Sequence, residues 1–109
     1  MAHSLQAIRK RKTYILIRNN GNIFRSKSFN VQILEDRKLE NQIYVGFTAT
    51  KKLGTAIKRN QAKRIMRQLA KKVITKFGKI NSYYVLIAKP PIFEIPFRSQ
   101  EIELKRLIS

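Results

Sequence analysis

The sequence contains no cysteine, one histidine and only six acidic residues among its 109. Without cysteine there can be no disulfide, no thiolate nucleophile and no cysteine-ligated zinc. No stretch approaches the ~20 apolar residues of a membrane span, and residues 1–12 lack the apolar block of a secretory signal. A transit peptide is the less favoured interpretation of this arginine-rich start, so we expect a cytoplasmic protein.

The length fits one compact domain, and 43% hydrophobic residues are too many for a disordered basic tail. No internal repeat or low-complexity linker divides the chain. We therefore expect a single domain over residues 1–109. Residues 1–12 are its basic N-terminal segment, which is either flexible or ordered by anions.

Few side chains are available for catalysis by the protein itself. His3 lies beside the initiator, a position more typical of a terminal residue than of a general base. A two-metal nuclease needs several carboxylates in one pocket, and the sequence has no catalytic triad, phosphate loop or dinucleotide fingerprint. We predict no catalytic residue and no metal site made of side chains. The acids are dispersed, at Glu35, Asp36, Glu40, Glu94, Glu101 and Glu103.

Positive charge is what the chain has in excess, since 24 lysines and arginines give a formal net charge of +18. Residues 1–27 hold seven basic residues and no acid, and residues 51–79 hold eleven and no acid. The rest of the chain is neutral in sum. A small fold with so much self-repulsion, so unevenly distributed, is expected to have an anionic partner.

Three segments are predicted as strands. Residues 28–34 and 43–49 alternate between apolar and polar side chains, and the acidic, amide-rich segment 35–42 between them predicts a hairpin. Residues 83–88 are apolar on both faces, as in a strand covered on both sides, and end before Pro90. The inward residues of the first two strands are Phe29, Val31, Ile33, Ile43, Val45, Phe47 and Ala49.

Residues 56–77 form the longest predicted helix, because apolar residues recur there at intervals of three and four. This stripe consists of Ala62, Ile65, Met66, Leu69, Val73 and Phe77. At ~100° per residue, the opposite side presents Asn60, Lys63, Arg64, Arg67 and Lys71, with Arg59 at the boundary. A second, short helix is expected over 101–108, with Glu101 and Glu103 in its first turn, where the helix dipole favours anions.

The cations of residues 58–72 form either a solvated helix face or a surface for a polyanion. Three observations favour a polyanion. The helix has no acids that would form i,i+4 pairs with its cations, like charges are crowded on one face, and the chain has a second acid-free segment. Arginine forks and mobile lysines suit phosphate, and Asn60 can add a hydrogen bond to a sugar or base. RNA is favoured over duplex DNA, because the helix lacks a helix-turn-helix partner and the domain is built on a sheet.

Residues 13–25, TYILIRNNGNIFR, allow two structures. Their β-branched and aromatic content favours a strand that enters a tight hairpin at Asn20-Gly21. A short helix that ends at Asn19-Asn20-Gly21 is the alternative.

The segment LGTAIKRNQAKRIMRQ (53–68), preceded by Thr50-Lys51-Lys52, closely resembles the signature of the bacterial ribonuclease P protein component. That signature, KK-x-G-x-A-x-x-RN-x-x-KR-x-x-R, opens the family's long helix. Residues 45–52 and 83–90 resemble the strands that enter and leave it, so the resemblance covers nearly the whole chain. The matching positions are Lys51, Lys52, Gly54, Ala56, Arg59, Asn60, Lys63, Arg64 and Arg67.

The resemblance implies an α/β (α+β) two-layer sandwich in the order α-β-β-β-α-β-α, similar to the second domain of ribosomal protein S5. Its sheet would have four strands, with an unusual left-handed β-α-β crossover. The family order also predicts a helix over 13–20 and a strand around 22–27, against the local propensity.

The resemblance also implies a function, namely the protein subunit of ribonuclease P. This endonuclease removes the 5′ leader of precursor transfer RNA at a Mg²⁺-dependent active site that lies in its RNA. The implied partners are that RNA and the leader, with Mg²⁺ held mainly by the RNA and no obligate protein partner or membrane. The implied RNA-binding residues are Lys51, Lys52, Arg59, Asn60, Lys63, Arg64, Arg67 and Lys71.

A cleft between the first helix and the sheet would receive the leader, and its implied residues are Tyr14, Arg18, Asn30 and Gln32. Tyr14 matches an aromatic position of the family, but Arg18 stands where a second aromatic is usual and Gln32 where tyrosine is common. Stacking contributes ~1–3 kcal/mol per base where a ring is present. Leader contact is therefore expected to depend more on charge and hydrogen bonds here.

Three alternatives remain. A structural RNA-binding protein of the ribosomal type, with no role in cleavage, would be indifferent to a leader. A protein of anionic membrane surfaces is less favoured, because helix 56–77 uses its apolar face on the sheet. A nuclease that acts alone would cleave without any RNA cofactor.

Overall fold

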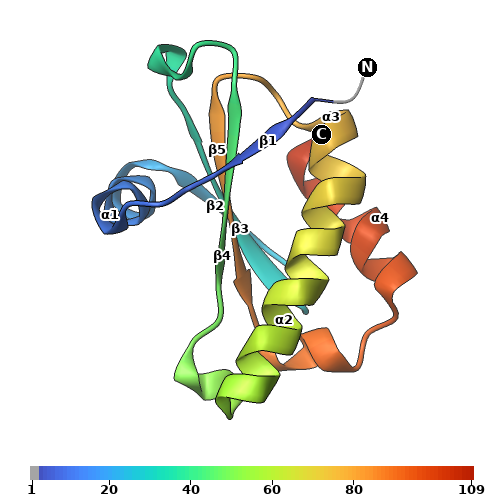
Figure 1. Cartoon of the computed structure of the whole chain (residues 1–109). Helices are drawn as coiled ribbons and strands as arrows, with labels where there is room; N and C mark the ends of the chain where they lie inside the picture. Colours follow the sequence, from blue (N-terminus) through green and yellow to red (C-terminus); the bar gives the residue numbers. More distant parts are fainter. Residues whose placement is uncertain (1–2) are drawn as a thin grey trace.

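The computed structural model describes residues 3–109 of the chain, and five strands in this part form one mixed sheet in the order β1-β4-β5-β3-β2 (Figure 1). β1, β4 and β5 are parallel neighbours, whereas β3 pairs antiparallel with both β5 and β2. The strands are β1 (Leu5–Ala7), β2 (Asn22–Arg25), β3 (Phe29–Glu35), β4 (Ile43–Thr48) and β5 (Ser82–Ala88). The helices are α1 (Arg11–Asn20), α2 (Ala56–Leu69), α3 (Thr75–Phe77) and α4 (Phe97–Ile108).

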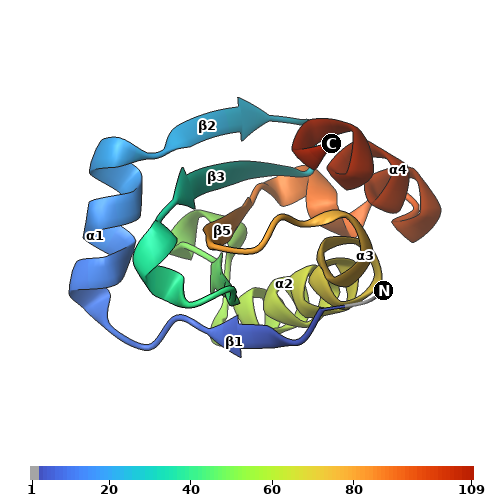
Figure 2. The ribbon, with the colours of Figure 1, turned by 90° about the horizontal axis from the view of Figure 1, so that it is seen from above.

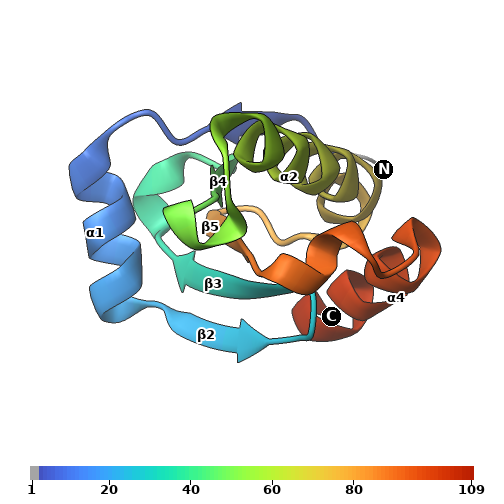
Figure 3. The ribbon, with the colours of Figure 1, turned by 90° about the horizontal axis from the view of Figure 1, so that it is seen from below.

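Helices cover both faces of the sheet, so the expected two layers are in fact three. Figures 2 and 3, which look along the sheet from above and below, show α1 on one side and α2 with α4 on the other. The central strand β5 is apolar on both faces for this reason. Leu86 belongs to the core under α2 and α4, whereas Val85 packs with the fully buried Ile17 of α1.

The prediction of a four-stranded sheet is wrong, because residues 3–109 form a sheet of five strands. β1 lies within the basic N-terminal segment and pairs parallel with β4, Leu5 opposite Ile43. The Ile8 N–H extends this pairing by donating to the Val45 carbonyl oxygen at 2.9 Å. A strand of three residues is too short to show a hydrophobic period, so the sequence did not reveal it.

The hairpin expected between residues 28–34 and 43–49 is also wrong. Both segments are strands, but β5 lies between them and pairs with each. A strand that is apolar on both faces is stabilised most at the centre of the sheet, where both faces are covered. The connection 36–42 therefore links strands that are not neighbours.

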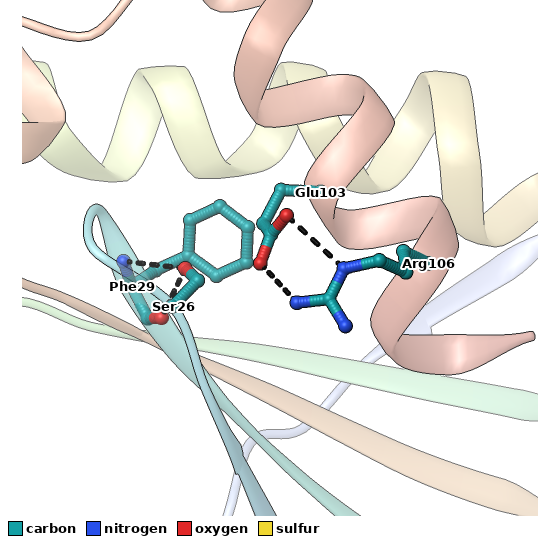
Figure 4. Close-up of polar contacts among 4 residues, drawn as sticks. All are labelled: Ser26, Phe29, Glu103 and Arg106. Carbon is teal, nitrogen blue, oxygen red and sulfur yellow. Dashed lines mark hydrogen bonds and ion pairs between the residues drawn. The ribbon is translucent and has the colours of Figure 1, made fainter.

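The hairpin that does form joins β2 to β3. In Figure 4, the Ser26 hydroxyl donates to the Phe29 carbonyl oxygen at 2.6 Å and accepts the Phe29 N–H at 3.3 Å. Residues 13–25 thus contain a helix and then a strand, as the family resemblance implies. The helix prevails over the local β propensity because α1 buries Ile17 on the sheet.

The long predicted helix is continuous from α2 to α3, but a π-helical turn, Ala70–Ile74, interrupts its α-helical period. Ala62, Met66, Leu69 and Val73 are buried as predicted. The wider turn also brings Ala70 and Ile74 into the core, and leaves Phe77 41% exposed. None of the helices within residues 3–109 is both long and apolar enough to span a bilayer.

The C-terminal helix starts at Phe97, so Glu101 and Glu103 lie beyond its first turn and the dipole argument for them is wrong. They instead pair along the helix, Glu101 with Arg98 at 3.8 Å and Glu103 with Arg106 (Figure 4). The hydrogen bond from Arg106 lowers the pKa of Glu103.

Replacing Leu69 by alanine is expected to lower the free energy of unfolding by ~2–5 kcal/mol, because it leaves a cavity in the core. Leu69 is fully buried. Urea unfolding followed by circular dichroism measures the change. The control is Gln68→Ala at the exposed neighbouring position, for which we expect a change within about 0.5 kcal/mol. Equal losses in both variants would contradict the packing of α2 described here.

Candidate nucleic-acid interface

The predicted RNA-binding residues lie on the solvent side of α2, in the turn that leads into it and, for Lys71, in the π-helical turn that follows it. α2 packs on the sheet through Ala62, Met66 and Leu69, so its opposite side is left to solvent. Of the eight residues, Arg59 and Lys63 are half-buried and the rest exposed. We call this set the cationic face: Lys51, Lys52, Arg59, Asn60, Lys63, Arg64, Arg67 and Lys71.

Local chemistry fixes where the cationic face begins. Lys51 and Lys52 lie in a 3-10 turn, Lys51–Leu53, that ends at Gly54 with φ of 119°, a conformation that favours glycine. Thr55 then caps α2, its hydroxyl oxygen accepting the Lys58 N–H at 3.3 Å. The two lysines therefore directly precede the α2 residues of the face.

No acid in the described part of the chain forms an ion pair with the cationic face. Within residues 3–109, both ion pairs lie on α4, between Arg98 and Glu101 and between Arg106 and Glu103. Arg59 also has a buried Nε atom with no hydrogen-bond partner in the described part of the chain. A buried donor without a partner costs free energy. A hydrogen-bond acceptor from a ligand would therefore stabilise the Arg59 side chain.

Two other lysines of this region contact aromatic rings and lie outside the cationic face. The Lys58 ammonium lies 5.8 Å from the centre of the Phe93 ring, and that of Lys72 lies 5.7 Å from the centre of the Phe97 ring. Such contacts stabilise a cation through the negative ring face. The free charge of α2 is therefore concentrated on the side away from α4.

The structure has a cleft between α1 and the sheet, with a cavity of about 270 Å³. Arg11, Tyr14, Ile15 and Arg18 line it from α1, and Gln32, Thr48, Val85 and Ile87 line it from the sheet. Three of the four predicted leader residues, Tyr14, Arg18 and Gln32, therefore lie together here.

Asn30, the fourth, does not line the cavity. It lies two residues before Gln32 on β3, in register with Ile87 of β5. Its Oδ1 atom is buried and has no hydrogen-bond partner among residues 3–109. Asn30 thus lies on the same face of β3 as Gln32 but outside the lining of the cavity.

Gly46 of β4 lies against the cleft residue Tyr14, and the sequence did not reveal this contact. A Cβ atom at this position would lie 2.5 Å from the hydroxyl oxygen of Tyr14 and 2.6 Å from its ring. The Tyr14 ring therefore rests on bare backbone. An isolated glycine inside a strand can indicate such a close approach, but its partner is distant in sequence. Arg11, Thr48 and Ile87 were missed for the same reason.

The cleft and the cationic face adjoin each other. Thr48 lines the cleft at the end of β4, and Lys51 follows three residues later. In Figure 1 the turn before α2 lies at the lower end of β4, between the α1 and α2 sides of the sheet. One polyanion can therefore contact both surfaces.

The described residues do not offer a metal site. Within 3–109 no three side chains among histidine, aspartate and glutamate group closely enough to hold an ion. The side chains of residues 3–109 therefore do not form a site that fits a Mg²⁺ ion. The arrangement is suited to binding a polyanion, with cations on α2 and a ring with cations in the cleft.

Known proteins with the same sequence features and fold are ribonuclease P proteins. The ribonuclease P protein component of Caulobacter vibrioides is 34% identical over 84 residues, which cover 77% of this chain and 56% of that protein. That of Nitratiruptor sp. is 27% identical over 105 residues, covering 95% of this chain and 90% of that one. The solved ribonuclease P protein of Thermotoga maritima superposes with a TM-score of 0.79 at 20% identity, with 94% of each chain covered.

The likeness to the Thermotoga protein concerns the fold, and the chain spans little more than half of the Caulobacter protein. The model of the family described as ribonuclease P matches residues 3–109, which is nearly the full length. Together with the cationic face and the α1 cleft, this match shows that the chain belongs to the ribonuclease P protein family.

Proposed function

We propose that this chain is the protein subunit of the endoribonuclease ribonuclease P and acts in the cytoplasm as a single RNA-binding domain over residues 1–109. It binds the catalytic RNA through the cationic face and holds the 5′ leader of precursor transfer RNA in the α1 cleft. The observation that carries the proposal is an acid-free cationic helix side directly beside a cleft. The chemistry of cleavage belongs to the RNA.

The cationic face contributes to RNA binding by neutralising phosphates. Each lysine or arginine that contacts a phosphate releases condensed counterions, which makes the affinity strongly dependent on salt. The planar guanidinium of arginine can bind a phosphate with two hydrogen bonds. Arg59, Arg64 and Arg67 supply such forks, and Asn60 can bind a sugar or base.

The cleft suits a single strand better than a duplex. Its one aromatic ring, Tyr14, can stack with a base, while Arg11 and Arg18 attract the phosphates on either side. Gln32 offers a donor and an acceptor to a base edge. Asn30 can add a hydrogen bond if its buried oxygen becomes accessible on binding.

Mg²⁺ enters this proposal through the RNA and not through the protein. The RNA fold brings phosphates together, and metal ions reduce their repulsion. Cations of the protein that lie against the same phosphates act in the same direction. No obligate protein partner is needed.

We also infer that the β4-α2-β5 crossover is left-handed, as in the domain of ribosomal protein S5, against the strong right-handed preference. β4 and β5 are parallel neighbours. In Figure 1 the chain runs down β4, up α2 on the right and down β5. Figure 2, seen from above, shows that β5 lies behind β4 in the view of Figure 1. This path supports the inference.

Reconstitution with a bacterial ribonuclease P RNA tests the proposed function. We expect the RNA with this chain to cleave leader-bearing precursor transfer RNA at a lower Mg²⁺ concentration than the RNA alone, because the protein neutralises phosphates. We also expect tighter binding of the precursor with its leader than without it. An unchanged Mg²⁺ requirement and equal affinities would instead favour a structural RNA-binding protein without a role in cleavage.

Replacing Arg59 and Arg64 together by alanine is expected to weaken binding of the ribonuclease P RNA. The slope of log affinity against log salt should fall by up to roughly 0.9 for each phosphate that the variant no longer binds. Filter binding over a range of KCl concentrations measures both quantities. Arg98→Ala with Lys105→Ala is the matched control, since it removes two charges from α4 and should leave the slope nearer to that of the unaltered chain. Identical slopes for both pairs would contradict the assignment of the cationic face.

Replacing Gly46 by alanine is expected to push the Tyr14 ring off its place in the cleft. The affinity of the reconstituted complex for leader-bearing precursor should then fall about tenfold, in the range of one base stack. Affinity for transfer RNA without a leader should stay the same. A double-mutant cycle with Tyr14→Leu provides the control, because the glycine change should add little once the ring is gone. Additive losses would show that Gly46 acts in some other way.

A further inference from the structure

A second hollow lies on the other side of α1 and has no role in the proposed function so far. Its cavity measures about 370 Å³ and shares no lining residue with the cleft. It is formed where β1 leads into α1 and where β4 and β5 begin. We call it the tyrosine hollow, and its main lining residues are Arg9, Lys10, Thr13, Leu39, Tyr44 and Tyr83.

Tyr44 and Tyr83 form an aromatic pair in the wall of this hollow. They are in register on the parallel strands β4 and β5, with ring centres 5.8 Å apart and ring planes tilted by 46°. One edge of the pair packs on the cluster around Ile17, but both residues are only half-buried. A planar apolar group such as a base can stack on an aromatic surface that stays accessible in this way.

The rim of the hollow is cationic. Arg9 and Lys10 line it, Arg11 and Lys12 follow directly in the sequence, and all four are exposed. Lys10 occupies the N-cap position of α1 without a side-chain cap, and the first turn of α1 has no acid. Cations at a helix N-terminus oppose the helix dipole, whereas an anion there would be favourable. The rim is thus complementary to a phosphate.

Asp36 acts on the tyrosine pair through its charge, and its carboxylate also accepts a backbone hydrogen bond. Asp36 accepts the Lys38 N–H at 3.0 Å. Burial is the main cause that raises the pKa of Tyr83, followed by the charge of Asp36 and by Tyr44. The Tyr83 hydroxyl therefore stays protonated at neutral pH and can donate a hydrogen bond. The hollow combines aromatic faces, a hydroxyl donor and cations, which is the chemistry that binds a nucleotide of single-stranded RNA.

At the start of α1, residues that are neighbours in the sequence line the two cavities. Arg11 lines the cleft, and its neighbour Lys10 lines the hollow. On α1 itself, Thr13 faces the hollow while Tyr14 faces the cleft. A single strand that leaves the cleft can therefore pass the basic residues 9–12 and reach Tyr44 and Tyr83 without crossing the apolar core.

We propose that the tyrosine hollow binds one further nucleotide of the same single-stranded leader that occupies the cleft. The base stacks on the Tyr44 and Tyr83 pair, and Arg9 and Lys10 bind the adjoining phosphate. This inference rests on the proposed function, because it extends the leader-binding surface around the N-terminus of α1. It assigns a function to the tyrosine pair and to Arg9 and Lys10, which do not line the cleft.

A series of precursors with leaders of increasing length tests the inference. The dissociation constants are measured with the reconstituted complex in Ca²⁺, so that cleavage is slow. For the unaltered chain we expect affinity to rise as the cleft fills and to rise again when the strand reaches the hollow. Tyr44→Leu with Tyr83→Leu should abolish only the second rise, a loss of about tenfold for long leaders. Binding of short leaders should not change.

Tyr14→Leu is the matched tyrosine control and should reduce the first rise instead. Since the tyrosine pair also supports packing, Arg9→Gln with Lys10→Gln provides a second test at exposed positions, and it too should lower affinity for long leaders only. Retention of the second rise in both double variants would overturn the inference. So would an equal loss for precursors without a leader, since the hollow would then contact the catalytic RNA. If the unaltered chain gave no gain from any leader, the proposed function would fail and the inference with it.

Discussion

The burial of one side of α2 on the sheet is the interaction on which the cationic face depends. Met66, Leu69 and Ala62 are fully buried under this helix, and a buried Met or Leu side chain contributes ~1.5–3 kcal/mol. The other side of α2 carries lysines and arginines that repel one another without any acid to relieve them. Apolar packing thus holds a helix that its own charges oppose, and it fixes which direction those charges face.

The central strand β5 links the cationic face to the cleft. Tyr84 and Leu86 pack beneath α2 and α4, while Val85 and Ile87 point to α1 and line the cleft. Successive residues of one strand therefore support the cationic face and the cleft. Because the interior of a protein is close-packed, these two surfaces are held in a fixed relation to each other.

The sequence predicted those features that depend on local periods and failed on those that depend on distant contacts. The prediction of the apolar stripe of α2 was correct through Leu69, because an amphipathic helix repeats its pattern every turn. The π-helical turn that follows could not be predicted, since Ala70 and Ile74 do not differ in type from residues of an ordinary α-helix. The order of strands was wrong, because nothing local says that β5 lies between β3 and β4. The helix α1 came from the family resemblance and not from propensity.

The same limit applies to the functional surfaces. Spacing alone placed Arg64 and Arg67 on one side of a helix, because that needs only the helical period. The support of Tyr14 by Gly46 joins residues 32 positions apart in the sequence, and the pairing of Tyr44 with Tyr83 requires the parallel register of β4 and β5. Contacts of this kind exist only once the sheet has formed.

The placement of the few acids explains how a chain of +18 can keep the cationic face free of competing carboxylates. Glu35, Asp36 and Glu40 lie at the far end of β4 from Lys51, and Glu94 ends the turn Pro90–Phe93. The α4 acids are paired with arginines of the same helix. A carboxylate on the solvent side of α2 would stabilise the free protein by pairing with a neighbouring cation. It would also repel each phosphate that approaches. The unpaired charge of α2 therefore costs stability in the free chain, and a polyanion bound to the cationic face would relieve that cost.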